Sequence, residues 1–415
     1  MIKKILVPIF VLFSFAAVAQ QGTASPYSFY GIGDVKFKGA VENRLMGGVS
    51  VFPDSIHINL QNPASYSSLK LTTFTVGGSF NATNFTSYNN KEKAQRTTVD
   101  YLAVGMPVAK KMGVTFGLLP YSSVGYRIRT EDTDGLIRKY TGTGGVNKAF
   151  LGLGYAINKN FSVGADMSYS FGKIETTSIF YTSGIQFGTE EFYNSDLAGL
   201  SFNLGAMYKT KVSKKYDFFG SLAYTPQSNL RLNNERIIAS KEYTETFTPG
   251  IVKQLDTQAS TVTLKMPSKL SVGLGFGEER KWLIGTEVTM QQSSGFGNRF
   301  NDITNATFEN AIKYSFGGYY IPNYSAFSNY FKKITYRAGF RYENTGMVIS
   351  NEKIKDYAVT AGFGFPLGGL FSNLNAGAEF GRRGTAKANL VEENYTNVII
   401  SISLNDQWFV KRMYD

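Results

Sequence analysis

The sequence predicts an all-β fold, a closed antiparallel barrel of fourteen strands. Composition is the first observation: of 415 residues, 15% are aromatic, only 18% are charged, and 43 are glycine. After residue 69, many segments alternate apolar with small or polar side chains, which is the pattern of strands with two different faces. The links between these segments alternate between short and long, as in outer-membrane barrels. We therefore expect an outer-membrane β-barrel.

The first nineteen residues have the features of an export signal. Lys3 and Lys4 precede an apolar run over residues 5–18, and Ala-Val-Ala ends at Ala19. We expect a secretory signal peptide over residues 1–19. A retained transmembrane anchor, the alternative, needs about 18 or more apolar residues. The chain has no cysteine, so neither a lipid-attachment site nor a disulfide framework is expected.

Residues 20–68 precede the first alternating segment, and residues 44–66 read RLMGGVSVFPDSIHINLQNPASY. The tandem glycines Gly47 and Gly48, with Pro53 and Pro63, argue against a long helix or a central strand. We expect residues 20–68 to be an irregular segment that fills the lumen of a barrel formed by residues 69–415.

The fourteen predicted strands cover approximately residues 69–85, 98–109, 112–126, 146–157, 161–176, 199–211, 217–231, 264–277, 281–291, 307–321, 334–346, 355–366, 372–384 and 393–404. The short links include Lys110-Lys111 and residues 158–160, and short turns lie on the periplasmic side of such barrels. Residues 323–333 form a long link where a short one is expected. On the outer side we expect an apolar loop over residues 178–193 and a polar loop over residues 232–263.

Alternation alone would also fit a soluble β-sandwich, and the lengths of the links favour the membrane barrel. The charged residues support placing the apolar face against lipid. A Lys or Arg on the lipid face near the bilayer midplane would cost about 2–4 kcal/mol, so charges should face the lumen. Those within the predicted strands do fall on the small, polar face, and residues of opposite sign occur together there. The predicted lumen charges are Asp166, Lys209, Glu287, Arg337, Arg341, Glu343 and Glu379.

A short set of residues carries a family resemblance. Gly47-Gly48-Val49, then Asp54, then Asn62-Pro63-Ala64 resembles the N-terminal signature of the FadL-like outer-membrane transporters of hydrophobic compounds. A second similarity is MPSKLSVG over residues 266–273, followed by Trp282. The resemblance implies a fourteen-stranded barrel plugged by an N-terminal hatch formed by these Gly, Asp and Asn-Pro-Ala residues. It also implies uptake of hydrophobic small molecules, such as long-chain fatty acids, through an opening in a kinked wall strand.

Pro120 and Gly125 are the candidates for that kink, within GVTFGLLPYSSVGY. Proline cannot donate to the strand ladder, so the strand is expected to bend there. A bulge at the outer rim, without a role in transport, is the alternative.

Two features resemble relatives of the Bacteroidota type: the largely polar loop over residues 232–263, and Trp408-Phe409 beyond the last strand. One branch of these, the PorV-like proteins, serves type 9 protein secretion. The resemblance therefore implies two alternative partners, a hydrophobic small molecule or a subunit of a secretion translocon.

Enzymatic chemistry is not expected. One histidine and no cysteine leave nothing for a nucleophilic triad or a zinc site, and no cofactor is implied. The Asp132-Thr133-Asp134-Gly135 segment is a fragment of a calcium loop, which we interpret as an outer loop. The glycines at 142, 144 and 145 are interpreted as another loop. The net charge of +12 is scattered, which fits loop lysines or attraction to membrane lipid and lipopolysaccharide better than nucleic-acid binding.

Overall fold

The computed structural model describes residues 22–37, 39–88, 90–182, 184–242, 251–299, 305–326, 329–368 and 372–408. The predicted signal peptide over residues 1–19 lies outside them. Helices are few and short: η1 (Pro26–Phe29), α2 (Val41–Arg44), η2 (Pro63–Ser68), η3 (Tyr330–Lys333) and η4 (Lys387–Asn389). Among the described residues, no helix is long and apolar enough to span a membrane.

The strands run through the rest of the chain. They are β1 (Asp34–Val35), β2 (Thr72–Thr86), β3 (Lys91–Ala109), β4 (Met112–Val124), β5 (Arg127–Glu131), β6 (Leu136–Ala156), β7 (Phe161–Thr182), β8 (Phe187–Lys211), β9 (Asp217–Thr225), β10 (Ser228–Glu242), β11 (Ile251–Gln254), β12 (Gln258–Met266), β13 (Lys269–Glu278), β14 (Trp282–Gln291), β15 (Ala306–Phe308), β16 (Ala311–Tyr320), β17 (Thr335–Ile349), β18 (Glu352–Pro366), β19 (Asn373–Gly384) and β20 (Glu392–Asp406).

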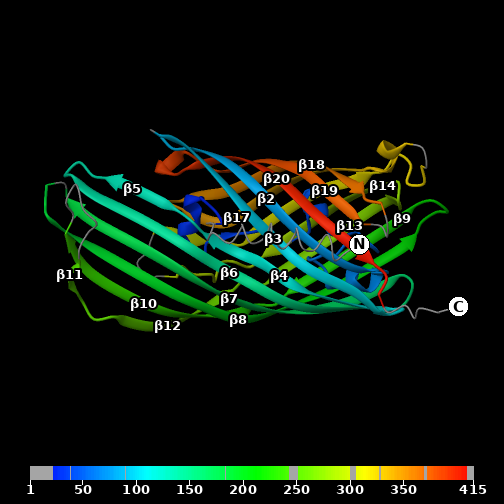
Figure 1. The fold of residues 1–415 in the computed structure, drawn as a ribbon, viewed down its shortest axis with the longest axis horizontal. Helices are drawn as coiled ribbons and strands as arrows, with labels where there is room; N and C mark the ends of the chain where they lie inside the picture. The colour runs from blue at the N-terminus through cyan, green and yellow to red at the C-terminus, as the bar shows by residue number, and fades with distance from the viewer. Residues whose placement is uncertain are drawn as a thin grey trace.

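These strands form one closed antiparallel barrel (Figure 1). Some wall strands are interrupted: β4 and β5 both pair with β6, β9 and β10 both pair with β8, and β15 and β16 both pair with β17. The next wall strand is interrupted in the same way: β12 pairs with β10, and β13 pairs with β9. Each such set of consecutive segments counts as one strand of the wall. The barrel closes between β2 and β20, from Thr72 opposite Asp406 to Thr86 opposite Glu392. The predicted 14-stranded barrel is confirmed.

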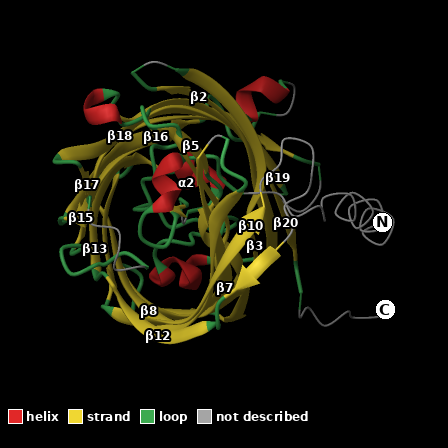
Figure 2. Cartoon of the chain, turned by 90° about the vertical axis from the view of Figure 1, so that its left-hand side faces the viewer, coloured by secondary structure: helices red, strands yellow, loops and turns green. Residues whose placement is uncertain are grey.

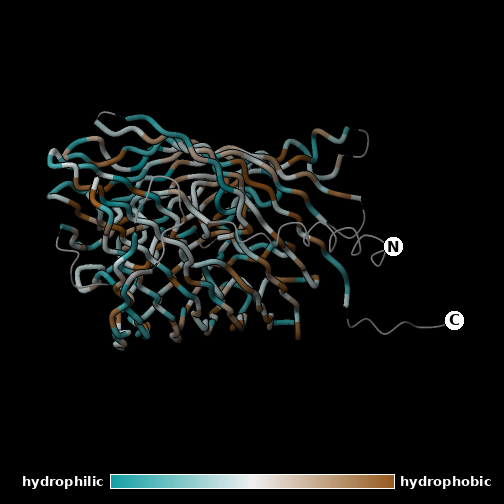
Figure 3. The backbone as a smooth tube through the Cα atoms, turned by 60° about the vertical axis from the view of Figure 1, so that its left-hand side comes forward, coloured by the Kyte–Doolittle hydropathy of each residue, from teal (hydrophilic) through white to brown (hydrophobic). Residues whose placement is uncertain are grey.

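The two faces of each wall strand differ as predicted. In β7, Met167 and Tyr169 are 46% and 48% exposed, whereas Asp166 and Ser168, which alternate with them, are buried. Figure 3 shows the same alternation of hydrophobic and hydrophilic residues along the strands. Because a barrel in a membrane has lipid outside, the exposed apolar side chains form its lipid face and the buried polar ones line the lumen.

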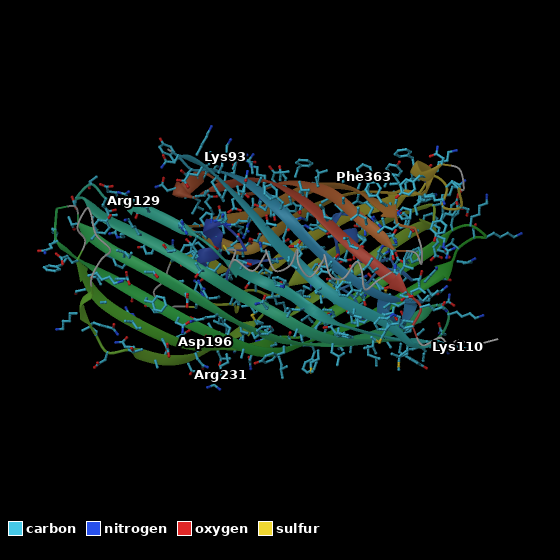
Figure 4. All side chains as sticks on the ribbon, viewed as in Figure 1. Lys93, Lys110, Arg129, Asp196, Arg231 and Phe363 are labelled. Atoms are coloured by element: carbon cyan, nitrogen blue, oxygen red, sulfur yellow. The ribbon has the colours of Figure 1, made fainter. Side chains whose placement is uncertain are left out.

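The predicted outer loops over residues 178–193 and 232–263 are wrong. Most of these residues belong to β7, β8, β10 and β12, which extend as a tall sheet on one side of the barrel (Figure 1). The glycines at 142, 144 and 145 likewise lie in β6 and not in a loop. The predictions failed because apolar residues no longer alternate there, although the ladder continues. Asp196 and Arg231 project outward from this sheet (Figure 4).

Residues 22–37 and 39–68, here called the lumen segment, lie inside the barrel. Figure 2 shows α2 within the ring of strands. Val41 and Leu45 of the lumen segment belong to a buried cluster with Tyr101 and Ile399 of the wall. A second cluster joins Val49, Val51 and Phe52 to Phe219 and Leu283. The apolar core of the protein therefore lies between this segment and the inner wall.

Candidate functional site

The lumen segment fits the wall because glycines of the wall leave room for its backbone. A Cβ atom added to Gly317 of β16 would lie 2.2 Å from the carbonyl oxygen of Met46, and one added to Gly339 of β17 would lie 2.2 Å from the nitrogen of Gly47. Gly47 itself has φ +68°, a conformation that favours glycine. The backbone of the segment therefore contacts the backbone of the wall directly.

The Asn62-Pro63-Ala64 turn is anchored to a different part of the wall. The Asn62 side-chain oxygen accepts a hydrogen bond from the Ala64 amide at 3.1 Å and so caps η2. Its side-chain nitrogen donates to the carbonyls of Ala206 in β8 and Leu222 in β9, at 3.3 and 3.1 Å. Asn62 therefore fixes the start of η2 both internally and against two wall strands.

Gly48 and Asp54 lie between these two anchors. Gly48 has φ +90° and accepts a hydrogen bond from the Gln61 side chain at 3.1 Å. The Asp54 carboxylate lies 2.7 Å from Nδ1 of His57 and accepts the Ile56 amide at 3.0 Å. Burial alone would lower the pKa of His57, but the Asp54 carboxylate outweighs it and raises that pKa. The structure thus places all the predicted hatch residues in the lumen segment, and their function as a hatch stays a prediction.

Arg44 of the lumen segment lies at the centre of a charge network. Its guanidinium is 2.7 Å from Glu379 of β19 and 3.4 Å from Asp100 of β3. Arg341 of β17 is 2.8 Å from the other oxygen of Glu379 and 3.1 Å from Asp356. Of the predicted lumen charges, the structure brings together Arg341, Glu379 and, 3.7 Å from Arg341, Glu343.

The other predicted lumen charges lie apart. Glu287 is 1% exposed and accepts hydrogen bonds from the amide and hydroxyl of Ser50, at 2.9 and 2.7 Å. Arg337 donates to Asn375 at 2.9 Å, and Asp166 accepts from Asn203 at 3.0 Å. Lys209 pairs with Glu279 near the short turns, at 2.7 Å. These residues hold the lumen segment and neighbouring strands in place and do not form one site.

Residues that sequence reasoning missed fix the start of the lumen segment at the end of the barrel where β19 leads to β20. Arg383 of β19 is 2.6 Å from Asp34 of β1, and Ser25 donates to Glu393 of β20. The partners are 349 and 368 residues apart. No local sequence signal could have paired them. Together with Arg44, Arg341 and Glu379 these residues line a cavity of about 330 Å³.

The wall has a seam between β3 and β4. The ladder between them runs from Ala109 opposite Met112 to Leu102 opposite Leu118. Beyond that point, within the described residues, β3 pairs only with β2, and β4 pairs on this edge with β1 of the lumen segment. Val35 lies opposite Ser122, and the Lys36 amide donates to the Tyr121 carbonyl at 2.9 Å. The lumen segment therefore occupies the strand edge that β3 leaves.

Pro120 and Gly125 both lie at this seam. Pro120 follows the last paired residues of β4 by two positions, and the register between β4 and β6 shifts between Pro120 and Ser122. From Tyr121 to Tyr126 every residue is buried, so the alternation of exposure ends here. The Gly125 amide donates to the hydroxyl of Ser28 at 3.3 Å, in the interval between β4 and β5. Both residues mark an irregular wall strand, and its function as an opening stays a prediction.

A buried apolar cluster lies beside the seam. It joins Ile32 of the lumen segment and Tyr121, Val124 and Tyr126 of the seam to inward-facing residues of the neighbouring wall strands. Those are Val146, Ile174, Leu197, Leu230, Leu232 and Leu264. Phe29 packs against the same cluster, with its ring 5.2 Å from that of Tyr126. This side of the lumen is apolar, in contrast to the charged network around Arg44.

The described residues contain no group of three or more His, Cys, Asp or Glu side chains that could hold a metal ion. In the predicted outer loop at residues 132–135, Asp132 instead pairs with Arg138 at 2.7 Å.

Solved structures with a similar fold include a FadL homologue and a toluene transporter. A FadL homologue of Pseudomonas aeruginosa aligns with a TM-score of 0.60 and 13% identity, over 90% of this chain and 98% of that one. The toluene transporter TodX of Pseudomonas putida aligns with a TM-score of 0.60 and 14% identity, over 90% and 98%. No curated protein sequence matches this chain.

The chain thus has the fold of these FadL and TodX structures, a closed barrel of the outer membrane. A family model described as BamG matches residues 1–415. The chain belongs to the BamG family.

Proposed function

We propose that this barrel takes up hydrophobic small molecules across the outer membrane, through the seam between β3 and β4. The observation that carries the proposal is the position of the apolar cluster. It lies inside the wall next to Pro120, where β3 and β4 no longer pair. An apolar molecule in the lumen would there be adjacent to the one edge of β4 that the wall does not close.

An apolar molecule would pass more readily through the apolar cluster, which faces β4 to β12, than through the charged network around Arg44. Arg44, Arg341 and Glu379 are paired with one another and buried, and an apolar molecule passing among them would replace none of their hydrogen bonds. Passage beside the apolar cluster would separate no such ion pairs. Phe29, Ile32 and β1 of the lumen segment fill this route, so transport requires them to move. The barrel is therefore a gated one.

A crosslink across the gate tests the proposal. The chain has no cysteine, so Val35→Cys with Ser122→Cys introduces a single pair, on residues directly opposite in β1 and β4. The pair is joined by oxidation or by a short bis-maleimide. Uptake of a labelled long-chain fatty acid and of toluene is measured in cells with an intact lipopolysaccharide layer, because phospholipid vesicles alone are permeable to apolar compounds.

We expect the unlinked variant to take up at least one compound and the crosslinked variant to lose most of that uptake. A matched control places the cysteines at Ser162 and Met207, opposite in the continuous ladder of β7 and β8, where a crosslink should leave uptake unchanged. Absence of uptake by the wild type, or uptake that survives the crosslink across the gate, would refute the route.

The tall outer sheet favours a second candidate, an interaction subunit of a surface or secretion machine, as in the PorV-like proteins. Beyond the apolar band, its outward side carries Lys173, Asp196 and Arg231, all exposed. A polar surface of this kind outside the membrane is suited to a protein partner. Purification in mild detergent should then recover a partner that is lost when Asp196 and Arg231 are both changed to alanine. Recovery of the barrel alone from native membranes would argue against this role.

A further inference from the structure

Positive charge is concentrated at the end of the barrel where β3 turns into β4. At the end of the barrel that holds Lys110, every turn from β3 to β14 contains lysine or arginine, and the long link before β17 does too. The residues are Lys110, Lys111, Lys159, Lys211, Lys214, Lys215, Arg280, Lys281, Lys332 and Lys333. We assign this end to the periplasm, because the opposite end carries the extensions of β7, β8, β10 and β12, and the extracellular part of an outer-membrane barrel is the longer one. Lys110 at this end and Lys93 and Arg129 at the other are labelled in Figure 4.

Few carboxylates balance these residues. The same turns contain Glu278 and Glu279, which already pair with Lys281 at 3.1 Å and Lys209 at 2.7 Å. In the part of the chain that the structure describes, no carboxylate lies within 4 Å of Lys110, Lys214 or Lys215. The outer end differs, because its charges pair locally, as Arg138 does with Asp132 and Lys353 with Glu309. The excess positive charge of the chain therefore lies mainly at the periplasmic end.

The basic turns lie at the depth of lipid headgroups. Exposed aromatic side chains mark the edge of the lipid face: Tyr155 precedes Lys159 by four residues and Tyr208 precedes Lys211 by three. At about 3.3 Å per residue along a tilted strand, the turns lie within about 10 Å of that edge. A lysine side chain can extend its ammonium group into this interfacial layer while its methylene groups remain against apolar surface.

The turn between β8 and β9 is the best defined of these places. Lys211, Lys214 and Lys215 are exposed there, directly before Tyr216. The Tyr216 ring lies 5.5 Å from that of Phe276 and 6.0 Å from that of Trp282, which are also 6.0 Å apart. Three lysines thus adjoin a cluster of three aromatic rings on the outside of the barrel. The arrangement offers cations for a phosphate and an apolar surface for the glycerol and upper acyl chain.

We propose that this turn binds anionic phospholipid of the inner leaflet, such as phosphatidylglycerol, in preference to zwitterionic lipid. The continuity of the lysines with the lipid face favours a lipid over an acidic protein as the occupant, because Tyr216 and Phe276 are themselves part of that face. Basic residues close to a membrane surface gain about 1 kcal/mol each from anionic lipid, whereas exposed protein ion pairs gain less. The inference does not depend on transport.

Trp282 provides a reporter beside the proposed site. The chain has two tryptophans, so Trp408→Phe leaves Trp282 as the single one. The full-length variant is reconstituted in phosphatidylcholine vesicles that contain a minor fraction of dibrominated phosphatidylglycerol or dibrominated phosphatidylcholine. Bromine quenches tryptophan on contact, so the ratio of the two quenching curves gives the relative affinity. We expect a preference of about fivefold for phosphatidylglycerol at low salt, as one retained lysine contact would give. It should disappear near 1 M salt, where charges are screened beyond about 3 Å.

Two variants complete the test in the Trp408→Phe background. K211Q/K214Q/K215Q should reduce the preference to about onefold, whereas K91Q/K93Q/K387Q, which removes exposed lysines from the outer end, should keep it. The heat-dependent shift in gel mobility verifies that each variant is a folded barrel, and K211R/K214R/K215R should restore binding. Equal quenching by the two lipids, or a preference that the K211Q/K214Q/K215Q variant retains, would overturn the proposal. Equal quenching together with loss of a co-purifying protein from that variant would identify an acidic protein as the occupant instead.

Discussion

Arg44 and Glu379 are 335 residues apart in the chain, and their Nη2 and Oε2 atoms lie 2.7 Å apart inside the barrel. Glu379 is 1% exposed and is shared with Arg341. A buried ion pair gains little net stability, because removing both charges from water costs about as much as their attraction returns. Its main effect is to define where the lumen segment can lie.

Replacing Glu379 by glutamine should therefore destabilise the barrel substantially. The change leaves the guanidiniums of Arg44 and Arg341 buried with less compensation, which costs about 3 kcal/mol when one partner of a buried pair is lost. The free energy of unfolding in urea, followed by gel mobility, measures the effect. As a control, Glu309→Gln removes the exposed partner of Lys353 and should cost less than about 1 kcal/mol. Equal effects of the two changes would contradict a buried network.

A single methyl group should displace the lumen segment. In Gly339→Ala the new Cβ would meet the backbone of Met46 and Gly47 at 2.2 Å, and neither backbone can move as a side-chain end could. We expect faster trypsin cleavage after Arg44 and a larger ion conductance in planar bilayers. Gly220→Ala is the matched control, because its Cβ would meet nothing closer than 4.0 Å. An unchanged cleavage rate in Gly339→Ala would show that the contact does not hold the segment.

Asn62 should matter more than its size suggests. Asn62→Ala removes the cap of η2 and two hydrogen bonds to wall carbonyls, which together contribute about 2–3 kcal/mol. We expect a loosened lumen segment, detected as faster amide hydrogen exchange over residues 62–68. Asn158→Ala removes a similar cap from an exposed turn, where Asn158 accepts from the amides of Asn160 and Phe161. That control should leave exchange over residues 62–68 unchanged.

The His57 and Asp54 pair predicts a dependence on pH. The pKa of His57 is raised in the folded protein, so its contribution to stability is complete below the unfolded value of about 6.5 and is lost as the pH rises through the folded value. Burial alone would raise the pKa of Asp54, but His57 outweighs this effect and lowers that pKa to about 2. The contribution of Asp54 to stability is therefore lost only as the pH falls below the unfolded value of about 3.9. The wild type should therefore unfold more readily at pH 9 than at pH 6.

The His57→Gln variant should lose that difference between pH 6 and pH 9. The effect should stay below about 1 kcal/mol, because the Asp54 side chain is 45% exposed and solvent screens the pair. The same pH dependence in wild type and variant would assign it to another group.

The fold was predictable from sequence because strand alternation is a local property. Successive side chains of a strand point to opposite faces, so the apolar neighbours of Asp166 and Glu379 indicate that these two carboxylates face the lumen. The outer ends of β7, β8, β10 and β12 were not predictable, since polar residues on both faces remove the pattern while the ladder continues.

The contacts of the lumen segment were harder to predict from the sequence. Gly47 could be recognised as unusual, but its match to Gly317 and Gly339 depends on the register of strands nearly 300 residues away. The pairing of Asp34 with Arg383 has the same origin. Pro120 did indicate an irregular strand, whereas the presence of β1 on its free edge needed the three-dimensional arrangement.

The pairing of β2 with β20 has a consequence for biogenesis. These are the first and last long strands of the chain, so the ring can be completed only after the whole polypeptide is available. The lumen segment directly precedes β2, and its anchors include β8, β9, β16, β17 and β19. An open, curved sheet can therefore fold around the segment before its two edges meet. Threading the segment into a ring already completed would require its backbone to pass the wall glycines one by one. We therefore expect the lumen segment to be enclosed when β2 pairs with β20.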